Sequence, residues 1–172
     1  MLDSHKLLVS FVLLLLGMAA CQPPAADAKN PLEGVWRIVE ETRIRADGET
    51  KNSNPQPSLY IFTDHHYSAV LVLSNEPRSL FAEAFRPTDT EKIAAYDSIV
   101  VNAGTYELTD STMTTHPIVA RIPNFMGGSA SYEYEVENDT LWLTLVDEYS
   151  REGVQYFLFP DTQILKKLVR IE

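Results

Sequence analysis

Cysteine is nearly absent from this sequence, because Cys21 is the only one among 172 residues. A single cysteine cannot form an internal disulfide, so no disulfide framework holds the fold together. The sequence also lacks a cysteine–histidine zinc motif, a glycine-rich phosphate loop and a nucleophile elbow. We therefore expect neither a metal nor a cofactor.

Basic residues are scarce as well: 14 lysines and arginines stand against 24 aspartates and glutamates, which gives a formal net charge of −10. A surface this acidic repels the phosphates of nucleic acids and the headgroups of anionic lipids. We therefore exclude nucleic acid as a partner. A small neutral or apolar ligand is compatible with this charge.

Long apolar runs are missing except near the N-terminus, where residues 7–16 are apolar apart from Ser10. This run is too short to span a bilayer and is typical of a secretory signal peptide. It leads through small residues to Cys21, which resembles the lipobox of bacterial lipoproteins with Met18 in place of the usual leucine. The alternative is an ordinary signal peptide cleaved after Ala20, but that would leave a free thiol in an oxidising compartment.

We therefore expect residues 1–20 to be a signal peptide and Cys21 to carry the lipid, with palmitate among its acyl chains. Residues 21–30 then form a flexible tether, and residues 31–172 form one domain. Gln22, directly after the cysteine, resembles the sorting pattern for the outer membrane. The expected location is the bacterial cell envelope, with the protein lipid-anchored in the outer membrane and facing the periplasm.

Alternation of apolar and polar residues dominates the chain after the tether, with turn residues about every eight to twelve positions. This pattern is typical of an antiparallel barrel or sandwich. The clearest unit is a hairpin at residues 131–146. If Asn138 and Asp139 form a two-residue turn, Tyr134 faces Leu143 on an apolar and aromatic side, while the other side is acidic.

So many short strands cannot easily hide their edges in an open sheet, whereas closure into a barrel removes the edges. We therefore predict an all-β fold, an antiparallel barrel of about 8–9 strands, with a two-sheet sandwich as the alternative. The capping-box spacing of Thr88 and Glu91 predicts one short helix at residues 89–98, between strands 3 and 4. The remaining strands are expected at residues 35–45, 58–63, 67–73, 103–108, 112–121, 154–159 and 163–171.

The connection before this helix is unusually apolar, because Leu80, Phe81 and Phe85 lie close together in it. We expect it to fold over something apolar at one end of the barrel, either as a plug or as a lid over a ligand portal. A later loop carries Phe125 and Met126 between proline and glycine residues. We assign this loop to the other rim of the opening.

Several short motifs share a family pattern. Gly34-Val35-Trp36 opens the first strand as G-x-W, and Asn-Ala-Gly-Thr-Tyr-Glu at 102–107, Thr-His-Pro at 115–117, Arg-Ile-Pro-Asn at 121–124 and the hairpin at 137–144 follow. Together they resemble the bacterial lipocalin-like domain family over nearly all of the mature chain. The resemblance implies a small antiparallel barrel. It also implies that Trp36 packs across the closed end beneath Arg170, where a guanidinium gains cation–π attraction from the indole.

A barrel of about eight strands either fills its interior with side chains or holds one small ligand. Buried tyrosine hydroxyls need hydrogen-bond partners, which a polar ligand or water can supply. The number of tyrosines therefore favours a cavity over a filled core. The candidate ligand contacts are the residues expected on the inner faces of the strands: Tyr106, Leu108, Met113, Val119, Tyr132, Tyr134, Leu143 and Leu145.

Arg121 is the most informative charged residue. If residues 110–111 form a two-residue turn, strand parity places both Val119 and Arg121 on the inner face. Arg121 then either anchors the acidic head group of a ligand or pairs with a carboxylate of the barrel. A bulge at Pro117 would reverse this parity.

The same register places His116 on the outer face, beside Glu107. Such a pair can act as acid and base because histidine titrates near neutrality, so His116 is the one weak catalytic candidate. More often, a pair of this kind is a cross-strand hydrogen bond.

These patterns predict a membrane-tethered envelope lipoprotein that binds a small, largely apolar molecule inside a barrel and is not an enzyme. One alternative is a small-barrel enzyme of the isomerase or cyclase type, which would use the tyrosines with His116 or Arg121. The other is a structural envelope protein with a filled core, marked by an exposed apolar patch rather than a pocket.

Overall fold

The structure is a computed structural model, and it describes residues 30–73, 75–156 and 162–172. The expected signal peptide, Cys21 and nearly all of the tether lie outside the described residues. The strands are β1 (Gly34–Arg45), β2 (Gly48–Asn52), β3 (Ser58–Phe62), β4 (His66–Val72), β5 (Ile99–Leu108), β6 (Thr112–Ala120), β7 (Ser129–Glu137), β8 (Thr140–Tyr149) and β9 (Gln163–Arg170).

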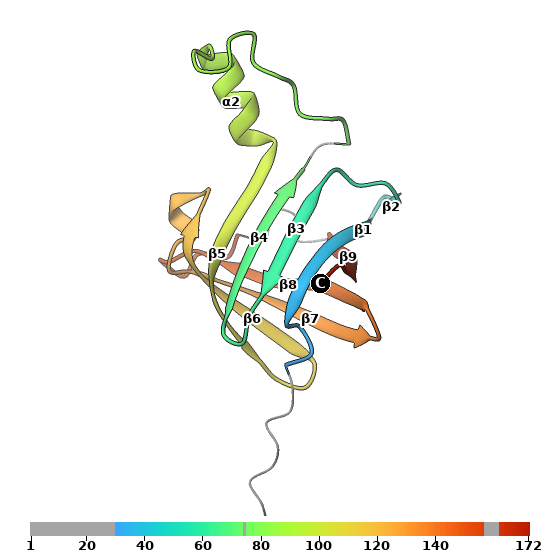
Figure 1. Ribbon diagram of the computed structural model, residues 1–172. Coiled ribbons are helices and arrows are strands. Elements are labelled where there is room, and N and C mark those ends of the chain that lie inside the picture. Colours follow the sequence, from blue (N-terminus) through green and yellow to red (C-terminus); the bar gives the residue numbers. More distant parts are fainter. Residues whose placement is uncertain (1–29, 74, 157–161) are drawn as a thin grey trace, which may run out of the picture.

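All of these strands belong to one antiparallel sheet in the order β2-β1-β3-β4-β5-β6-β7-β8-β9, and β1 also pairs with β9. Strand β1 is long enough for its first residues to pair with β3, its last residues with β2 and its opposite edge with β9. Eight strands therefore close into a barrel, and β2 is an extra strand attached to β1 (Figure 1). The antiparallel barrel predicted from the sequence is confirmed.

Three segments differ from the predicted strands. Strand β5 begins at Ile99, before the expected start at residue 103. Strand β2 has the sequence Gly-Glu-Thr-Lys-Asn, which contains no apolar residue and so gave no alternation to predict it. The strand expected at 154–159 is reduced to one bridge between Tyr149 and Gln155, and residues 157–159 lie outside the described part of the chain.

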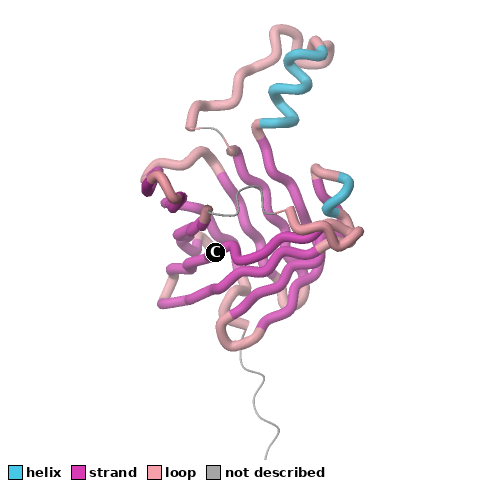
Figure 2. The backbone as a smooth tube through the Cα atoms, turned by 180° about the vertical axis from the view of Figure 1, so that it is seen from behind, coloured by secondary structure: helices cyan, strands magenta, loops and turns pink. Residues whose placement is uncertain are grey.

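The helix α2 (Asp89–Asp97) lies between β4 and β5, one strand later than expected because β2 precedes it. It begins with the predicted capping box, in which the Glu91 backbone N–H donates to the Thr88 hydroxyl and the Thr88 backbone N–H donates to the Glu91 carboxylate. None of its residues is buried, and it stands beyond one end of the barrel (Figures 1 and 2). Within the described ranges, no helix has the length and apolar character needed to cross a membrane.

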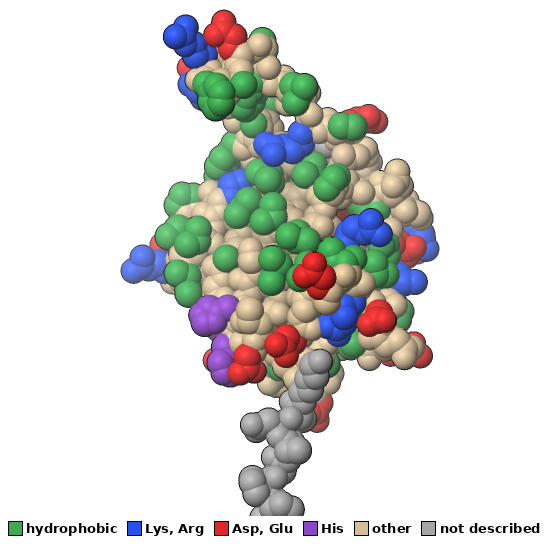
Figure 3. Space-filling view, in the orientation of Figure 1, with side chains coloured by type: hydrophobic (Ala, Val, Ile, Leu, Met, Phe, Trp, Pro, Cys, Tyr) green, Lys and Arg blue, Asp and Glu red, His purple; other side chains and the backbone are tan. Residues whose placement is uncertain are grey.

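Residues 75–98, which we call the arm, point away from the barrel. Leu80 is 95% exposed and Phe85 is 99% exposed, so the interpretation of this segment as a plug is wrong. A hydrogen bond within the arm holds its two parts together: the Glu91 carboxylate accepts from the backbone N–H of Ala82 at 2.8 Å. Figure 3 shows the resulting apolar surface on the projecting arm.

The β7–β8 and β5–β6 hairpins have the predicted registers. Tyr134 pairs with Leu143 across β7 and β8, and Leu108 pairs with Met113 across β5 and β6. Asn138 has a φ of 54°, a left-handed conformation that asparagine tolerates in a two-residue hairpin turn.

The core fills the closed half of the barrel, at the end opposite α2. Trp36 is 0% exposed, and its indole N–H donates to the carbonyl of Leu32 at 2.7 Å. The Arg170 guanidinium lies over the Trp36 ring, 4.1 Å from the centroid, and also donates to the carbonyl of Pro31 at 2.9 Å. The two residues expected at the closed end therefore meet there. The core extends from Leu32 to Leu168 and includes Ile38, Phe62, Tyr106, Met113, Leu141 and Leu143.

Three register shifts interrupt the alternation of inner and outer side chains in the open half. They leave an extra residue at Val39 in β1, at Ile118 in β6 and at Val146 in β8. An extra residue on one strand moves the side chains that follow to the opposite face. These β-bulges therefore place side chains of Glu41 and Glu148 inside the barrel, where simple alternation would have placed their neighbours.

Candidate functional site

A cavity of about 430 Å³ occupies the open half of the barrel. It lies where β1, β4, β6 and β8 end and where β5 and β9 begin, so inner side chains reach it from most of the ring. The barrel is thus filled in its closed half and hollow in its open half, and a cavity of this size can hold a small molecule. Most of the wall is apolar and includes Leu73, Val100, Ala120, Ile122, Phe125, Leu145 and Ile164.

Arg121 lines this cavity, as strand parity predicted, but it does so from just beyond the end of β6. The bulge at Ile118 turns Val119 outward, where it is 58% exposed, and leaves Arg121 just beyond the end of β6. Its guanidinium donates to the carbonyl of Tyr96 in α2 and lies 4.6 Å from the centroid of the Tyr96 ring. The expectation that Val119 lies on the inner face is therefore wrong, and the reason is a bulge beside Pro117, the alternative that the sequence offered. Arg121 does reach the interior, where it forms part of the cavity wall.

A layer of polar side chains lies between the cavity and the apolar core. Tyr60, Tyr67 and Tyr132 point into the barrel from β3, β4 and β7, and Lys166 points inward from β9. The Lys166 ammonium donates to the Tyr60 hydroxyl at 3.4 Å. Glu148 lines the cavity, and its carboxyl interacts electrostatically with the Lys166 ammonium. It therefore lies at the boundary between the polar layer and the cavity.

Burial controls the protonation of the three phenols. It raises the pKa of Tyr67 to about 12, and it also raises the pKa values of Tyr60 and Tyr132. Glu41 raises the pKa of Tyr60 further, whereas Lys166 opposes part of the rise at Tyr132. All three side chains are therefore neutral at physiological pH and serve as hydrogen-bonding groups, not as bases.

The hydroxyl of Tyr67 is the least satisfied polar group of the layer. The side chain is 5% exposed, and its oxygen has no hydrogen-bond partner among the described residues. Thr115 is close enough to oppose part of the pKa rise of Tyr67, but no hydrogen bond joins the two hydroxyls, and Thr115 donates instead to the carbonyl of Ala130 at 3.2 Å. A buried polar group of this kind costs stability unless a ligand or water contacts it.

We expect Tyr67→Phe and Tyr106→Phe to change stability in opposite directions. The Tyr106 hydroxyl donates to the Thr63 carbonyl and accepts from the Asn30 amide, both at 2.5 Å, so its removal should lower the free energy of unfolding by about 1–3 kcal/mol. Removing the unpartnered Tyr67 hydroxyl should be neutral or stabilising by up to about 1 kcal/mol. Urea denaturation measures both changes. A loss above about 1 kcal/mol in Tyr67→Phe would show that this hydroxyl has a partner.

The carboxyl of Glu148 should make stability fall as the pH rises. Burial raises its pKa above the usual 4.5, and Lys166 opposes part of that rise. The folded protein therefore keeps a proton that the unfolded chain has already lost, so stability decreases from the unfolded pKa upward through the folded pKa. Glu148→Gln should remove this decrease. It should be more stable than the wild type at pH 7, by about 1 kcal/mol or less because the cavity admits solvent.

Urea midpoints measured from pH 4 to pH 8 test this expectation. Glu133→Gln is the matched control, because Glu133 lies on the exposed face of the same hairpin. The expectation fails if the stability difference between wild type and Glu148→Gln stays constant across this pH range.

The predicted ligand contacts fall into different environments. Met113, Leu143 and Tyr106 belong to the filled core, and Tyr132 belongs to the polar layer. The Tyr134 hydroxyl donates to the carbonyl of Thr109 at 2.9 Å, at the closed end. Of the predicted ligand contacts, Arg121 and Leu145 line the cavity of the open half, whereas Tyr106, Leu108, Met113, Val119, Tyr132, Tyr134 and Leu143 do not.

Of the expected rim residues, Phe125 lines the cavity and is buried, whereas Met126 is partly exposed and does not line it. His116 pairs with Thr105 on the outer face of the barrel, so the structure does not bring it to the inner tyrosines.

Of the charged residues in the interior, sequence reasoning found Arg121 but missed Arg43, Glu148 and Lys166. Lys166 lies two residues before the buried Leu168 and on the same face of β9, so the alternation in this strand would have predicted that Lys166 points inward. Arg43 and Glu148 could not be found in this way. The bulges at Val39 and Val146 precede them in the chain and exchange the inner and outer faces for the residues that follow.

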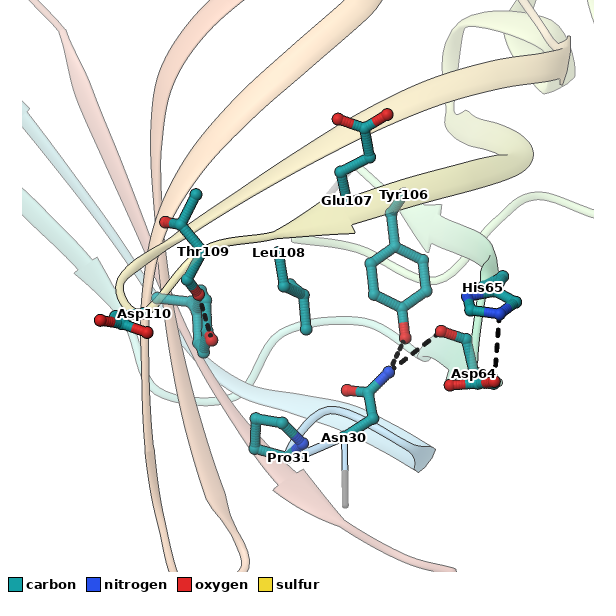
Figure 4. A pocket seen from close by; sticks show the side chains of 10 residues that line it. Asn30, Pro31, Asp64, His65, Tyr106, Glu107, Leu108, Thr109 and Asp110 are labelled. Carbon is teal, nitrogen blue, oxygen red and sulfur yellow. Dashed lines mark hydrogen bonds and ion pairs between the residues drawn. The ribbon is translucent and has the colours of Figure 1, made fainter. Parts of the chain in front are cut away.

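A second hollow lies on the outside of the closed end (Figure 4). Figure 4 shows Asn30, Asp64 and Tyr106 turned toward one another, and the Asn30 amide donates to both the Asp64 carbonyl and the Tyr106 hydroxyl. His65 lies 3.1 Å from the Asp64 carboxylate. Because these polar groups satisfy one another and the hollow is open to solvent, we take the cavity of the open half as the candidate site.

Comparison with known proteins agrees with this architecture. A family model described as a lipocalin-like domain matches residues 33–155. No curated protein matches the chain. Among solved structures, a lipocalin-like protein from Bacteroides uniformis is 14% identical, with a TM-score of 0.43 over 83% of this chain and 100% of that one. An uncharacterized protein from Bacteroides eggerthii is 11% identical, with a TM-score of 0.39 over 79% and 98% of the two chains. Because the family model covers most of the sequence, the chain belongs to the lipocalin-like domain family.

Proposed function

We propose that this protein is a lipid-anchored protein of the bacterial cell envelope that binds one small, largely apolar molecule in the open half of its barrel. The observation that supports ligand binding is the cavity of about 430 Å³, whose wall is mostly apolar. Small-molecule sites in proteins have volumes of about 300–1,000 Å³ and similarly apolar walls.

The place where the described chain enters the barrel supports the proposed lipid anchor. Residue 30 and the start of β1 lie at the closed end of the barrel, opposite α2 and the cavity (Figure 1). A tether from Cys21 to this point spans at most about 30 Å when extended. A lipid on Cys21 would therefore hold the closed end toward the membrane and leave the mouth facing the periplasm.

The two alternatives from the sequence receive less support. An isomerase or cyclase that uses the tyrosines with His116 or Arg121 needs these groups in one pocket. His116 lies outside the barrel, and the inner tyrosines Tyr60, Tyr67 and Tyr132 do not line the cavity that Arg121 lines. A structural protein with a filled core would lack the cavity. The barrel does expose apolar side chains over the outer face of β3 and β6, including Leu59, Ile61 and Val119, so a binding partner on this face is the second candidate function (Figure 3).

Ligand binding can be tested with the chain from Gln22 onward, which contains every core residue of the barrel. N-phenyl-1-naphthylamine is a neutral, apolar probe whose fluorescence rises in an apolar site. We expect saturable binding with one probe per protein. Absence of saturable binding would reject the proposed function.

A pair of variants locates the bound probe. Ala120 lines the cavity, whereas its neighbour Val119 faces outward, so Ala120→Phe fills the cavity and Val119→Phe does not. We expect Ala120→Phe to weaken probe binding about tenfold or more, a cost of at least about 1.4 kcal/mol, and Val119→Phe to leave it unchanged. Circular dichroism and urea denaturation check that both variants fold. Equal losses in the two folded variants would place the probe elsewhere.

The lipid anchor has a separate test. Labelled palmitate should be incorporated into the full chain in a bacterial host and should be absent from Cys21→Ser. The labelled protein should fractionate with the membrane, and the variant should not. Equal membrane association of both proteins would reject lipid anchoring at Cys21.

A further inference from the structure

Three arginines line the mouth of the cavity in a protein whose net charge is −10. Arg43 and Arg45 belong to the end of β1, and Arg121 follows the end of β6. In the closed ring, three strands separate β1 from β6 on either side, so Arg121 stands across the mouth from the other two. Among the described residues, Glu148 is the one acidic side chain that lines the cavity.

The charge of Arg121 has only neutral partners. Its contacts are the Tyr96 carbonyl and the Tyr96 ring, and its Nε atom is buried with no hydrogen-bond partner in the described part of the chain. No carboxylate among the described residues forms an ion pair with it. Arg43 differs, because the Glu41 carboxylate lies 2.7 Å from its guanidinium. The uncompensated positive charge at the mouth is therefore centred on Arg121, and charges that leave bulk water are normally paired.

Tyr96 also holds the guanidinium in a fixed position. The Tyr96 hydroxyl donates to the Arg121 carbonyl at 3.0 Å while the Tyr96 carbonyl accepts from the Arg121 guanidinium, so the two residues are joined at two points. These contacts leave part of the guanidinium fork unused. A fork that is already oriented loses little conformational freedom when it binds an anion, which favours affinity.

We infer that the mouth of the barrel binds the oxyanion head group of an amphipathic ligand, with Arg121 as its main contact and with the apolar body of the ligand against Leu145 and Ile164. This inference rests on the proposed function, because it names the chemical class of the molecule that the cavity binds. The class is a long-chain carboxylate or a long-chain alkyl phosphate. Both present oxygens that a guanidinium contacts with two parallel hydrogen bonds.

The test compares four ligands that share a twelve-carbon chain and differ in the head group: dodecanoate, dodecyl phosphate, dodecanol and dodecyltrimethylammonium. Each competes with N-phenyl-1-naphthylamine for the chain from Gln22 onward, below its micellar concentration. We expect at least one of the two anions to bind about tenfold to hundredfold more tightly than the alcohol, and the cation to bind most weakly. The ratio of the two anions shows whether carboxylate or phosphate is preferred.

Variants at Arg121 separate charge recognition from a structural effect. Arg121→Gln should reduce anion affinity to that of the alcohol and leave alcohol affinity unchanged, and Arg121→Lys should retain part of the preference for anions. Arg86→Gln is the matched control, because Arg86 is exposed on the arm and does not line the cavity. It removes one positive charge and should change no affinity.

The outcomes distinguish this inference from the proposed function. If wild-type protein binds the alcohol and the anions equally, the inference is overturned while the proposed function stands. If Arg121→Gln weakens the alcohol as much as the anions, Arg121 shapes the mouth without recognising charge, and the inference is also overturned. If no ligand competes and no probe binds, the proposed function fails as well.

Discussion

Replacing Trp36 with alanine should lower the free energy of unfolding by about 3–5 kcal/mol. The side chain is fully buried at the closed end, so its loss removes the largest member of the core and leaves a cavity that the closed barrel cannot collapse. The carbonyl of Leu32 also loses the indole N–H that it accepts at 2.7 Å, and Arg170 loses the ring on which it lies. The melting temperature should fall by roughly 10 °C or more.

The second tryptophan provides a matched control for this prediction. Trp142 lies on the outer face of β8, where Lys167 stands 5.8 Å from its ring centroid. Trp142→Ala should therefore cost about 1 kcal/mol or less, close to an ordinary surface substitution. Urea and thermal denaturation measure both variants, and circular dichroism checks the fold. Equal costs for the two substitutions would contradict the assignment of Trp36 as the residue that closes the barrel.

The closed half of the barrel could be predicted from the sequence because its strands alternate without interruption. In the β7–β8 hairpin, a two-residue turn fixes the register, and the pairing of Tyr134 with Leu143 follows directly. The contact between Trp36 and Arg170 was implied by family resemblance and is present in the structure. Both features depend on local sequence or on a fixed motif, and neither requires knowledge of how distant strands pair.

The open half could not be predicted in the same way, because the three bulges lie there. The bulges at Val39 and Val146 leave no reliable mark in the sequence, whereas Pro117 signals the bulge at Ile118. Each bulge reverses which side chains enter the cavity. Alternation therefore placed Val119 inside and missed Glu148. The candidate site is the part of the molecule where local pattern and observed geometry disagree, which is common for functional sites.

The arm shows a different limit of sequence reasoning. Its apolar residues predicted a plug or a lid, since exposed apolar side chains cost solubility unless they are covered. The capping box of α2 was correctly predicted because it is a local hydrogen-bonding pattern. The direction in which the arm leaves the barrel depends on the end of β4 and on the contact between Tyr96 and Arg121, which are distant in sequence.

Replacing Gly104 with alanine should be about as damaging as the loss of Trp36. Gly104 lies opposite Pro117, beside the bulge in β6, where the two strands approach closely. A Cβ atom on this residue would lie 2.0 Å from the His116 carbonyl oxygen and 2.8 Å from the Ile118 nitrogen. Both are backbone atoms, so no side chain can move aside, and β5 and β6 would have to separate. We expect a loss of about 3 kcal/mol or more, at the upper end of overpacking costs.

The neighbouring residue Thr105 supplies the control, because its side chain lies on the outer face of the same strand opposite His116. Thr105→Ala should cost less than about 1 kcal/mol, the range of strand propensity on an open face. Separation of β5 from β6 would also disturb the cavity, which these strands line through Asn102 and Ala120. Folded Gly104→Ala protein should therefore bind N-phenyl-1-naphthylamine more weakly than Thr105→Ala. A Gly104→Ala variant with wild-type stability and probe affinity would show that the two strands can separate without cost, and the bulge would then not define the site.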